Sequence, residues 1–417
     1  MKLAKLFLIG MLGCAAGQKV VLERDLGVKP IGVVLDEDAV DWKALVEGDS
    51  TGGWVQLGGK AEYEVKDGVV TGRAVTGTPN SFLTTRGFYG DFVLEYEYKV
   101  DPRLNSGVQI RSRSIPEYRN GQVHGYQVEI DPSDRAWSSG IYEEGRRGWL
   151  NPLTGNDAAR QAFKQGEWNH VKVRAVGDHL ATWMNGVPAA DLLDAMTQEG
   201  FIGLQVHGIG KKEELAGATV QWRNLRIKDL GRHVWRPLMG DDLRGWTATP
   251  GGKWEIIDGV LRGTSPASEA RHGILLSDRE FGEFTVRFQF RALKGNSGFY
   301  FRVAKVDHAV AVKGFQAEIE PGSATGGLYE TLGRGWVAKS EVKMMEKIYK
   351  AGEWAEMVVS AHGGRLAVFV NGRKTVELKD DPGSRKGHLG FQLHGSDEME
   401  VEFKGIEMLV PEVTNPR

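Results

Sequence analysis

The sequence predicts an all-β protein made of two tandem antiparallel sandwiches. An ordered set of sequence blocks occurs twice, turn dipeptides separate short alternating segments, and almost no stretch has helical periodicity. The 417 residues include 56 Gly and 12 Trp, which is typical of a turn-rich β protein. Domains of this length with many short strands fit a jelly roll.

The repeat is the strongest of these observations. Its offset narrows only from 191 residues (Asn105 to Asn296) to 186 (Trp168 to Trp354), so the blocks keep their order. A period of that size suits two whole domains. The paired blocks are Asn105-Ser106-Gly107 and Asn296-Ser297-Gly298, 125–130 and 314–319, 166–168 and 352–354, 185–186 and 371–372, and 203–208 and 390–395.

The repeat sets the expected domain limits. We expect a leader segment over residues 18–40, copy one over 41–230, copy two over 234–410 and a tail over 411–417. The junction of residues 231–233 is short, which favours packed domains over a flexible tether.

Residues 1–17 read as an export signal. Lys2 and Lys5 precede a short apolar core, and small residues follow at 13–17. Cys14, the only cysteine in the chain, lies in this cleavage zone. It is either an incidental residue near a signal-peptidase cut or the lipid-bearing Cys of a lipoprotein. We therefore expect an exported protein of the periplasm or cell envelope, with membrane attachment only in the case that Cys14 carries a lipid.

The charge pattern argues against a nucleic-acid partner. The net charge is −2 and the pI is about 6.6, with Lys and Arg scattered along the chain. A nucleic-acid-binding domain would concentrate basic residues on one face or helix.

Each copy divides into short predicted strands. Asp67-Gly68, Asn185-Gly186, Asp258-Gly259 and Asn371-Gly372 predict hairpin turns, because such turns need positive φ. One short helix is expected over 157–163. Alternation predicts strands over 92–98, 108–111, 126–130, 170–175 and 181–184, and over 284–290, 299–303, 357–361 and 366–370.

Alternation also predicts which polar side chains share a face. In copy one these are Gln109 and Arg111, then Gln127, Glu129 and Asp131, then Gln205 and His207. In copy two they are Tyr300 and Arg302, then Gln316, Glu318 and Glu320, then Gln392 and His394. The face is either an ordinary solvated surface or the polar floor of a concave sheet. Its repetition in both copies favours a functional floor.

These blocks carry a family resemblance. Asn-Ser-Gly-x-x-x-Arg, Gly-Tyr-Gln-Val-Glu-Ile-Asp, Gly-Glu-Trp-Asn and Leu-Gln-x-His-Gly, ending on 222–227, resemble the 3-keto-disaccharide hydrolase domain family. The likeness covers nearly all of copy one and most of copy two. It implies concanavalin-like lectin/glucanase jelly rolls and cleavage of 3-keto glycosides.

The implied chemistry is coherent. A ketone at C3 acidifies the C2 proton, so a modest base removes it and the C1 substituent leaves by elimination; hydration can follow. The reaction needs a base, an acid for the leaving group, and a donor or metal that holds the enolate. We expect Glu129 as the base, His207 as the acid or electrophilic stabiliser, and Arg111 gripping a sugar oxygen.

Further side chains in copy one are expected to bind the sugar, because Trp faces stack on sugar rings and Arg or Asp grip hydroxyls. They are Gln109, Gln127, Asp131, Asp134, Arg135, Trp137, Tyr142, Glu143, Arg147, Trp149 and Gln205. The equivalents expected in copy two are Arg302, Gln316, Glu318, Tyr329, Trp336, Gln392 and His394. Copy two has Gly322 to Thr325 where copy one has Asp134, Arg135 and Trp137, so the main site is expected in copy one.

Two alternatives stay open. The sequence identifies no definite cofactor, and Glu129, Asp131 and His207 could instead hold a divalent cation. A pair of non-catalytic carbohydrate-binding modules, or a scaffold, would use the same fold. The acidic face with its histidine favours the enzyme, because a lectin can bind sugar with Trp, Asn and Arg alone.

Overall fold

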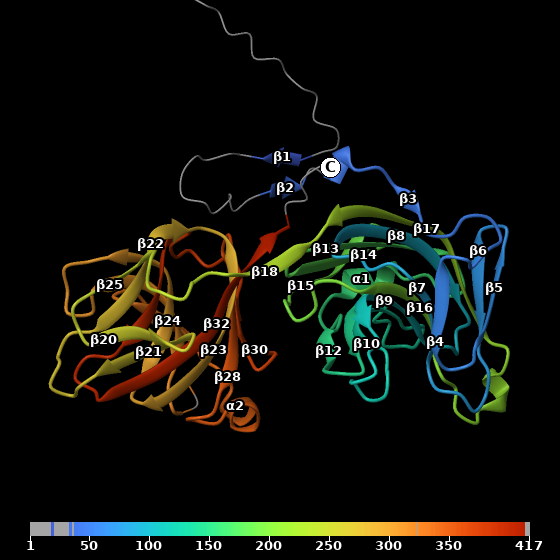
Figure 1. Cartoon of the computed structure of the whole chain (residues 1–417). Coiled ribbons are helices and arrows are strands. Elements are labelled where there is room, and N and C mark those ends of the chain that lie inside the picture. The colour runs from blue at the N-terminus through green and yellow to red at the C-terminus, as the bar shows by residue number, and fades with distance from the viewer. Residues whose placement is uncertain (1–17, 21–32, 36, 323, 413–417) are drawn as a thin grey trace, which may run out of the picture. The chain divides into compact units, whose positions relative to one another are not determined.

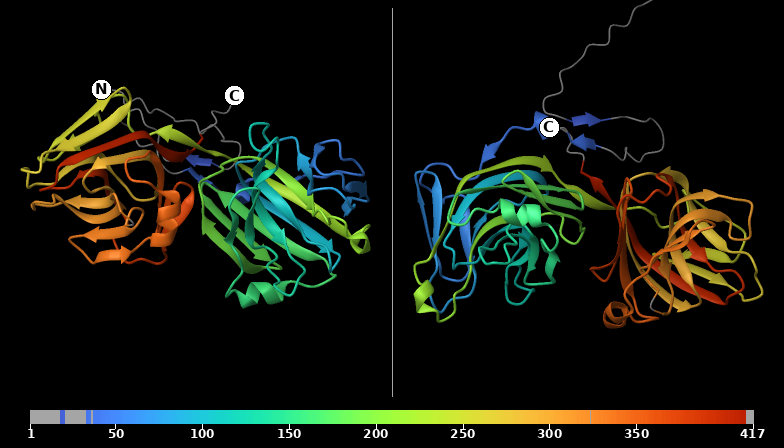
Figure 2. Two further views of the ribbon diagram at one scale, coloured as in Figure 1. Left: turned by 90° about the horizontal axis from the view of Figure 1, so that it is seen from below. Right: turned by 180° about the vertical axis from the view of Figure 1, so that it is seen from behind.

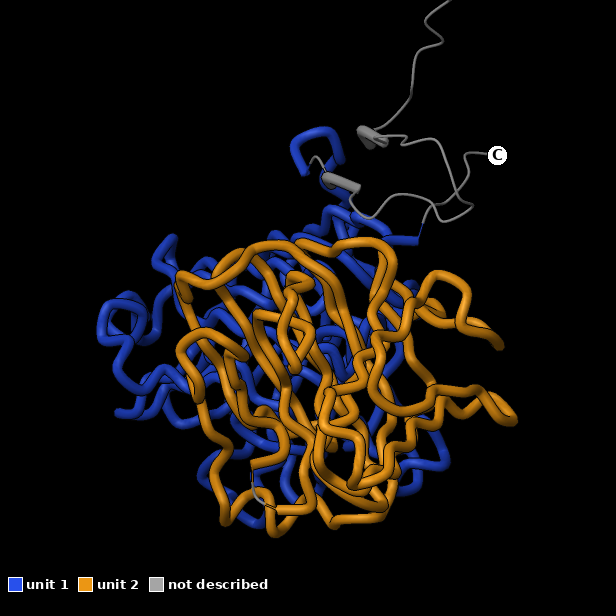
Figure 3. Tube along the Cα trace, turned by 90° about the vertical axis from the view of Figure 1, so that its left-hand side faces the viewer, with its two compact units in different colours: residues 1–233, 411–417 blue, residues 234–410 orange. Residues whose placement is uncertain are grey.

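The computed structural model describes residues 18–20, 33–35, 37–322 and 324–412 (Figure 1). The expected export signal with Cys14 lies outside these residues, as do 21–32 and 36 of the leader and 413–417 of the tail. The chain forms two compact units, residues 1–233 with 411–417 and residues 234–410 (Figure 3). In the leader, β1 (Gln18–Val20) pairs antiparallel with β2 (Val33–Leu35), and the short 3-10 helix η1 spans Glu37–Ala39.

The first unit is built from two antiparallel sheets (Figures 1 and 2). One is seven-stranded, in the order β12-β11-β10-β9-β16-β7-β4. Its strands are β4 (Trp54–Gly58), β7 (Ser81–Thr85), β9 (Ser106–Arg113), β10 (His124–Ile130), β11 (Ile141–Glu144), β12 (Gly148–Asn151) and β16 (Phe201–Val206). The other is eight-stranded, in the order β15-β14-β13-β8-β17-β6-β5 with β3 beside β17. Its strands are β3 (Lys43–Ala44), β5 (Glu62–Lys66), β6 (Val69–Arg73), β8 (Asp91–Val100), β13 (Asn169–Val176), β14 (His179–Met184), β15 (Val187–Leu193) and β17 (Thr219–Gly231).

The second unit repeats this topology. Its seven-stranded sheet has the order β19-β22-β31-β24-β25-β26-β27, with β19 (Trp246–Ala248), β22 (Gly273–Phe281), β24 (Ser297–Lys305), β25 (Val312–Ile319), β26 (Leu328–Thr331), β27 (Gly335–Ala338) and β31 (Gly387–Leu393). Its eight-stranded sheet has the order β20-β21-β32-β23-β28-β29-β30, with β18 beside β32. These strands are β18 (His233–Pro237), β20 (Lys253–Ile257), β21 (Val260–Ser265), β23 (Phe284–Lys294), β28 (Ala355–His362), β29 (Arg365–Val370), β30 (Arg373–Leu378) and β32 (Met399–Pro411).

When the strand order of each sheet in the second unit is read backwards, it matches the strand order of the corresponding sheet in the first unit. The all-β fold class with two tandem jelly-roll sandwiches is therefore confirmed. The turn residues Asp67, Asn185, Asp258 and Asn371 have φ of 51°, 49°, 50° and 47°, as their hairpins require. Helices are few among the described residues. Besides η1 they are α1 (Asp157–Ala162), which the sequence predicts, its counterpart α2 (Val342–Ile348), which it does not, and the 3-10 helix η2 (Glu213–Leu215).

The core of each unit lies between its two sheets, because alternate residues of every strand point inward. In the first unit Val108, Ile110 and Val128 of the seven-stranded sheet pack with Tyr96 and Trp222 of the eight-stranded sheet, all fully buried. Burying each of the Val and Ile side chains stabilises the fold by roughly 1.5–3 kcal/mol. Within the described part of the chain, no helix has the length and apolar character that crossing a membrane requires.

Candidate functional site

The outer side of the seven-stranded sheet in the first unit carries a continuous set of polar side chains. Tyr142 on β11 lies opposite Gln127 on β10, which lies opposite Gln109 on β9. In the next row Glu129 lies opposite Gly107, and Gly107 lies opposite Gln205 on β16. We call this side the polar face; it consists of Gln109, Gln127, Glu129, Tyr142, Glu144 and Gln205.

The Asn-Ser-Gly block organises this face. The Asn105 side chain donates to a carboxylate oxygen of Glu129 at 2.7 Å. The Ser106 hydroxyl donates to the backbone carbonyl of Gln205 at 2.6 Å. Gly107 leaves room for the side chain of Gln127, since a Cβ at this position would lie 2.5 Å from Gln127 Cδ. Each residue of the block therefore has a separate task in building the site.

The second unit repeats the same contacts. The Asn296 side chain donates to the Glu318 carboxylate at 2.6 Å, and the Ser297 hydroxyl donates to the backbone carbonyl of Gln392 at 2.7 Å. A Cβ at Gly298 would lie 2.4 Å from Nε2 of Gln316, the counterpart of Gln127. The paired blocks of the sequence thus correspond to paired sites.

A chain of hydrogen bonds ends on the Glu129 carboxylate. Ser112 donates to Gln109 at 2.7 Å, Gln109 donates to Gln127 at 2.5 Å, and Gln127 donates to Glu129 at 2.8 Å. With Asn105 on its other oxygen, the carboxylate is held in one orientation. In the second unit Gln316 donates to Glu318 at 3.0 Å in the same way.

Burial shapes the charge of these carboxyl groups. Glu129 and Glu318 are each 5% exposed. Burial raises the pKa of Glu129, although the hydrogen bonds from Asn105 and Gln127 counteract this shift. Burial raises the pKa of Glu318 to about 7. A carboxylate with a raised pKa is a stronger base than an ordinary one, which suits proton abstraction near neutral pH.

His207 follows β16 and is exposed beside the polar face. Its Nδ1 lies 2.9 Å from the Gly208 carbonyl, so the ring nitrogen there must be the donor. The protein atoms around the ring lower its pKa by desolvation. The neutral ring therefore presents Nε2 as an acceptor, which differs from the expected role as an acid or electrophilic stabiliser. His394 keeps the same contact, with Nδ1 2.8 Å from the Gly395 carbonyl.

Asp131 lies under the loop that follows β10 and organises it. The Asp131 side chain accepts hydrogen bonds from Arg135 at 2.8 Å, from the Ser133 hydroxyl at 2.6 Å and from the Trp137 backbone at 3.2 Å. Burial alone would raise the pKa of Asp131, but these hydrogen bonds lower it. Asp131 thus shapes the loop instead of reaching a sugar, while Asp134 is exposed on the same loop.

An aromatic group borders the polar face. The Trp149 ring lies 4.8 Å from Trp137 and 5.4 Å from Tyr142, measured between ring centroids. The Arg135 guanidinium lies 4.7 Å from the Trp137 ring and 5.2 Å from Trp149. Such rings and a cation provide stacking surface and hydroxyl contacts for a sugar. In the second unit the Tyr329 and Trp336 rings lie 5.5 Å apart, without counterparts of Arg135 and Trp137.

Arg111 does not lie on the polar face, which corrects the expectation. It has φ of 45° at a bulge in β9, where the register to β16 shifts, so the alternation of side chains breaks. Its guanidinium is fully buried and donates to the carbonyls of Gly90 at 2.7 Å and Gly177 at 2.6 Å, and to Asp91 at 3.0 Å. Arg302 has φ of 51° and donates to carbonyls in the same manner. Both arginines are structural.

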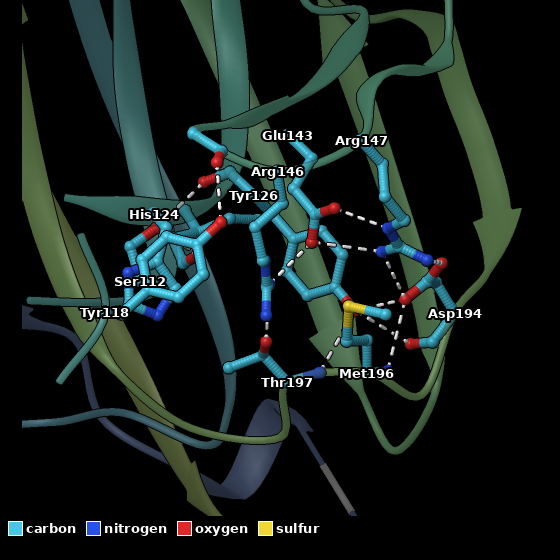
Figure 4. Close-up of polar contacts among 12 residues, drawn as sticks. Ser112, Tyr118, His124, Tyr126, Glu143, Arg146, Arg147, Asp194, Met196 and Thr197 are labelled. Carbon is cyan, nitrogen blue, oxygen red and sulfur yellow. Dashed lines mark hydrogen bonds and ion pairs between the residues drawn. The ribbon is translucent and has the colours of Figure 1, made fainter. Parts of the chain in front are cut away.

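Glu143 and Arg147 also differ from the expectation (Figure 4). Glu143 is fully buried and pairs with Arg147, which also contacts Asp194 at 2.9 Å. Tyr126 donates to the same Asp194 at 2.5 Å. Glu143 faces the core side with Ile141, so this ion cluster stabilises the unit and does not face a ligand on the polar face. The second unit keeps it as Glu330, Arg334 and Asp381.

Glu144 is a residue of the polar face that the sequence interpretation missed. Its two carboxylate oxygens accept hydrogen bonds of 3.4 Å from Asn80 and Gln205. Burial raises the pKa of Glu144. The two hydrogen bonds oppose this shift but are the smaller effect, so the pKa stays raised. Alternation from the apolar Ile141 was the available signal, because it puts Tyr142 and Glu144 together on the outer side.

A family model matches most of the chain. The description is a 3-keto-alpha-glucoside-1,2-lyase-like domain, and it matches residues 41–228 and again residues 234–409. The chain belongs to this family. Both of its units are lyase-like domains, and the resemblance noted in the sequence is confirmed. Membership connects the protein with carbohydrates.

Solved structures similar to the lyase-like domains are distant. A putative glycosyl hydrolase from Parabacteroides distasonis ATCC 8503 has 19% identity and a TM-score of 0.33, over 43% of this chain and 94% of its own. The carbohydrate-binding module CBM66 from Bacillus subtilis has 17% identity and a TM-score of 0.31, over 41% and 98%. A protein of unknown function with a galectin-like fold from Bacillus subtilis has 16% identity and a TM-score of 0.32, over 43% and 96%. A comparison with curated proteins finds no match.

The expected alternative of a cation site in the first lyase-like domain lacks support from the geometry. Across the described residues, no group of three or more His, Cys, Asp or Glu side chains is arranged to hold a metal ion. Two of the three candidate ligands already accept hydrogen bonds from protein side chains. Asp131 accepts from Arg135 and Ser133, and Glu129 accepts from Asn105 and Gln127.

Proposed function

We propose that the first lyase-like domain cleaves 3-keto glycosides by removing the C2 proton and expelling the C1 substituent. The observation that carries this proposal is the Glu129 carboxyl: nearly buried, raised in pKa, and oriented by Asn105 and Gln127 on a face bordered by Trp and Tyr. Positioning of this kind converts a weak base into an effective one. Hydration of the product can follow, with hydrolysis as the net result.

We assign Glu129 as the base. The ketone at C3 delocalises the charge that forms at C2, so the developing enolate needs a donor. The phenol of Tyr142, in the row beside Gln127, suits this role. Nε2 of the neutral His207 ring accepts a hydrogen bond from a sugar hydroxyl, and the Trp137 and Trp149 rings with Arg135 hold the sugar by stacking and hydroxyl contacts.

The test is Glu129→Gln, assayed on a 3-keto disaccharide with products followed by NMR. We expect turnover to fall by about 10²–10⁴-fold, the usual contribution of a general base. Exchange of the C2 proton with deuterated solvent should fall in parallel. Glu318→Gln is the matched control in the second domain and should retain most of the activity.

Other outcomes decide against the proposal. Near wild-type turnover of Glu129→Gln would place the base elsewhere. Binding of sugars by the wild-type protein without cleavage of any 3-keto glycoside would favour the non-catalytic carbohydrate-binding function.

We also propose that the protein is exported to the periplasm or cell envelope, on the pattern of residues 1–17. Export predicts recovery in the envelope fraction. Incorporation of labelled palmitate that Cys14→Ser abolishes would identify a lipoprotein, whereas no incorporation would indicate a cleaved signal.

A further inference from the structure

The two lyase-like domains share their buried carboxylate but differ at a second carboxyl group. Glu144 is the last residue of β11 in the first domain, and Thr331 is the last residue of β26, the corresponding strand, in the second. The two strands otherwise match, since Tyr142 pairs with Gln127 as Tyr329 pairs with Gln316. The second domain therefore keeps the base and lacks the second carboxyl.

The position of Glu144 relates it to the base. Its carboxyl contacts the amide of Gln205, and Gln205 lies in the row of Glu129 with only Gly107 between them. Two strand spacings separate that pair, or about 10 Å between Cα atoms. Because Glu144 reaches from β11 over to β16 and to Asn80, its carboxyl lies above the sheet and on the same side as Glu129. A sugar ring on this face can meet both carboxyl groups.

The hydrogen bonds of the two carboxyl groups differ in length. Glu129 accepts bonds of 2.7 and 2.8 Å, which stabilise its anion. Glu144 accepts two bonds of 3.4 Å, which stabilise its anion much less while burial favours the neutral acid. Burial raises the pKa of both carboxyl groups, but the shorter hydrogen bonds stabilise the anion of Glu129 better than that of Glu144. Of the two, Glu129 is therefore the better placed base and Glu144 the better placed acid.

We propose that Glu144 is the general acid of the first domain and protonates the leaving oxygen. This inference rests on the proposed function. Glu129 takes the proton from C2, the electron pair forms the C1–C2 double bond by way of the enolate, the C1–O bond breaks, and the leaving oxygen takes the proton of Glu144. The step needs no oxidant or reductant, and solvent restores both protonation states. His207, whose Nδ1–H already donates to the Gly208 carbonyl, is not required to protonate the leaving oxygen.

The test uses leaving groups of different basicity. A sugar alkoxide needs a proton on departure, whereas 4-nitrophenolate does not. Glu144→Gln should lower turnover of a 3-keto disaccharide by about 10²–10⁴-fold and that of a 4-nitrophenyl 3-keto-glucoside by less than about threefold. Glu213→Gln, which removes an exposed carboxylate on η2, is the matched control and should leave both rates unchanged.

Equal losses on both substrates, or no loss on either, would overturn the assignment of Glu144. A wild-type protein that cleaves neither substrate would instead contradict the proposed function, so the two failures are distinguishable. If Glu144→Gln does not fold, the pH profile of the wild type decides. The disaccharide rate should fall at high pH as the acid loses its proton while the nitrophenyl rate does not, and identical profiles would reject the inference.

Discussion

Asn105 donates a hydrogen bond of 2.7 Å to Glu129, and Asn296 donates one of 2.6 Å to Glu318 at the matching place in the second domain. The carboxylate and its immediate support are therefore duplicated, while three residues near them are not. Glu144, Arg135 and Trp137 occur in the first domain alone. The differences between the domains lie in the groups that would hold and protonate a substrate.

Gly107→Ala should impair activity through Gln127. The added Cβ would lie 2.5 Å from Gln127 Cδ, so the amide must move and the carboxylate of Glu129 loses one of its two supports. A displacement of about 1 Å near a reacting group can lower turnover by about 10²-fold. Steady-state kinetics on a 3-keto disaccharide measures the loss. Gly87→Ala, where no atom lies within 4 Å, is the control, and equal activity of the two variants would contradict this role of Gly107.

Glu318 should make the stability of the protein depend on pH. Its pKa rises from 4.5 to about 7 on folding, so the folded state holds the proton more tightly than the unfolded state. The resulting stability is fully present below pH 4.5 and is lost as pH rises through 7. The free energy of unfolding of the wild type relative to Glu318→Gln should fall by about 3 kcal/mol between pH 4.5 and 8. Urea unfolding at both pH values measures it, and a constant difference would show that this carboxyl is not perturbed.

Arg111→Met should cost stability. Arg111 is fully buried with Asp91, which also contacts His233 at 2.5 Å, so the substitution leaves a buried carboxylate with one partner fewer. Removing one member of a buried ion pair costs about 3–5 kcal/mol. Arg302→Met should cost less, because the partners of Arg302 among the described residues are the backbone carbonyls of Gly282, Gly363 and Ser384. Urea unfolding compares the two, and an Arg111 variant as stable as the wild type would contradict this account. The folded fraction should keep its KM, since the guanidinium does not reach the polar face.

Much of the fold could be predicted from the sequence because its signals are local. Asn185-Gly186 and Asn371-Gly372 specify turns through their own φ preference, and the alternation in 126–130 specifies which side of the strand is apolar. Because the blocks occur twice, each such inference from one copy is supported by the matching residues of the other copy. The helix α2 was missed because its start carries no capping signal: the Asn156 side chain caps α1 by accepting from the Ala159 backbone, whereas Glu341 at the start of α2 makes no such bond.

The site could be predicted only where alternation is unbroken. Gln109, Gln127, Glu129 and Gln205 lie on regular strands and share one face. Alternation fails at Arg111, because a bulge inserts one residue and reverses the side on which the next side chain lies. The sequence gives no sign of that bulge, since Arg is not a residue that favours positive φ.

The last prediction compares the two histidines that end the matching strands. The Nδ1 of each histidine lies beside the carbonyl of the following glycine, but the Nδ1 of His394 also lies 3.0 Å from Asp397, and its ring packs 4.4 Å from His272. Because Arg135, Trp137 and Glu144 surround only the first site, His207→Ala should reduce activity on a 3-keto disaccharide more than His394→Ala does. Both variants should be assayed in the full-length protein after circular dichroism shows that they fold. A larger loss from His394→Ala would move the main site to the second domain, equal partial losses would mean two working sites, and no loss from either would leave catalysis without the contribution of these rings.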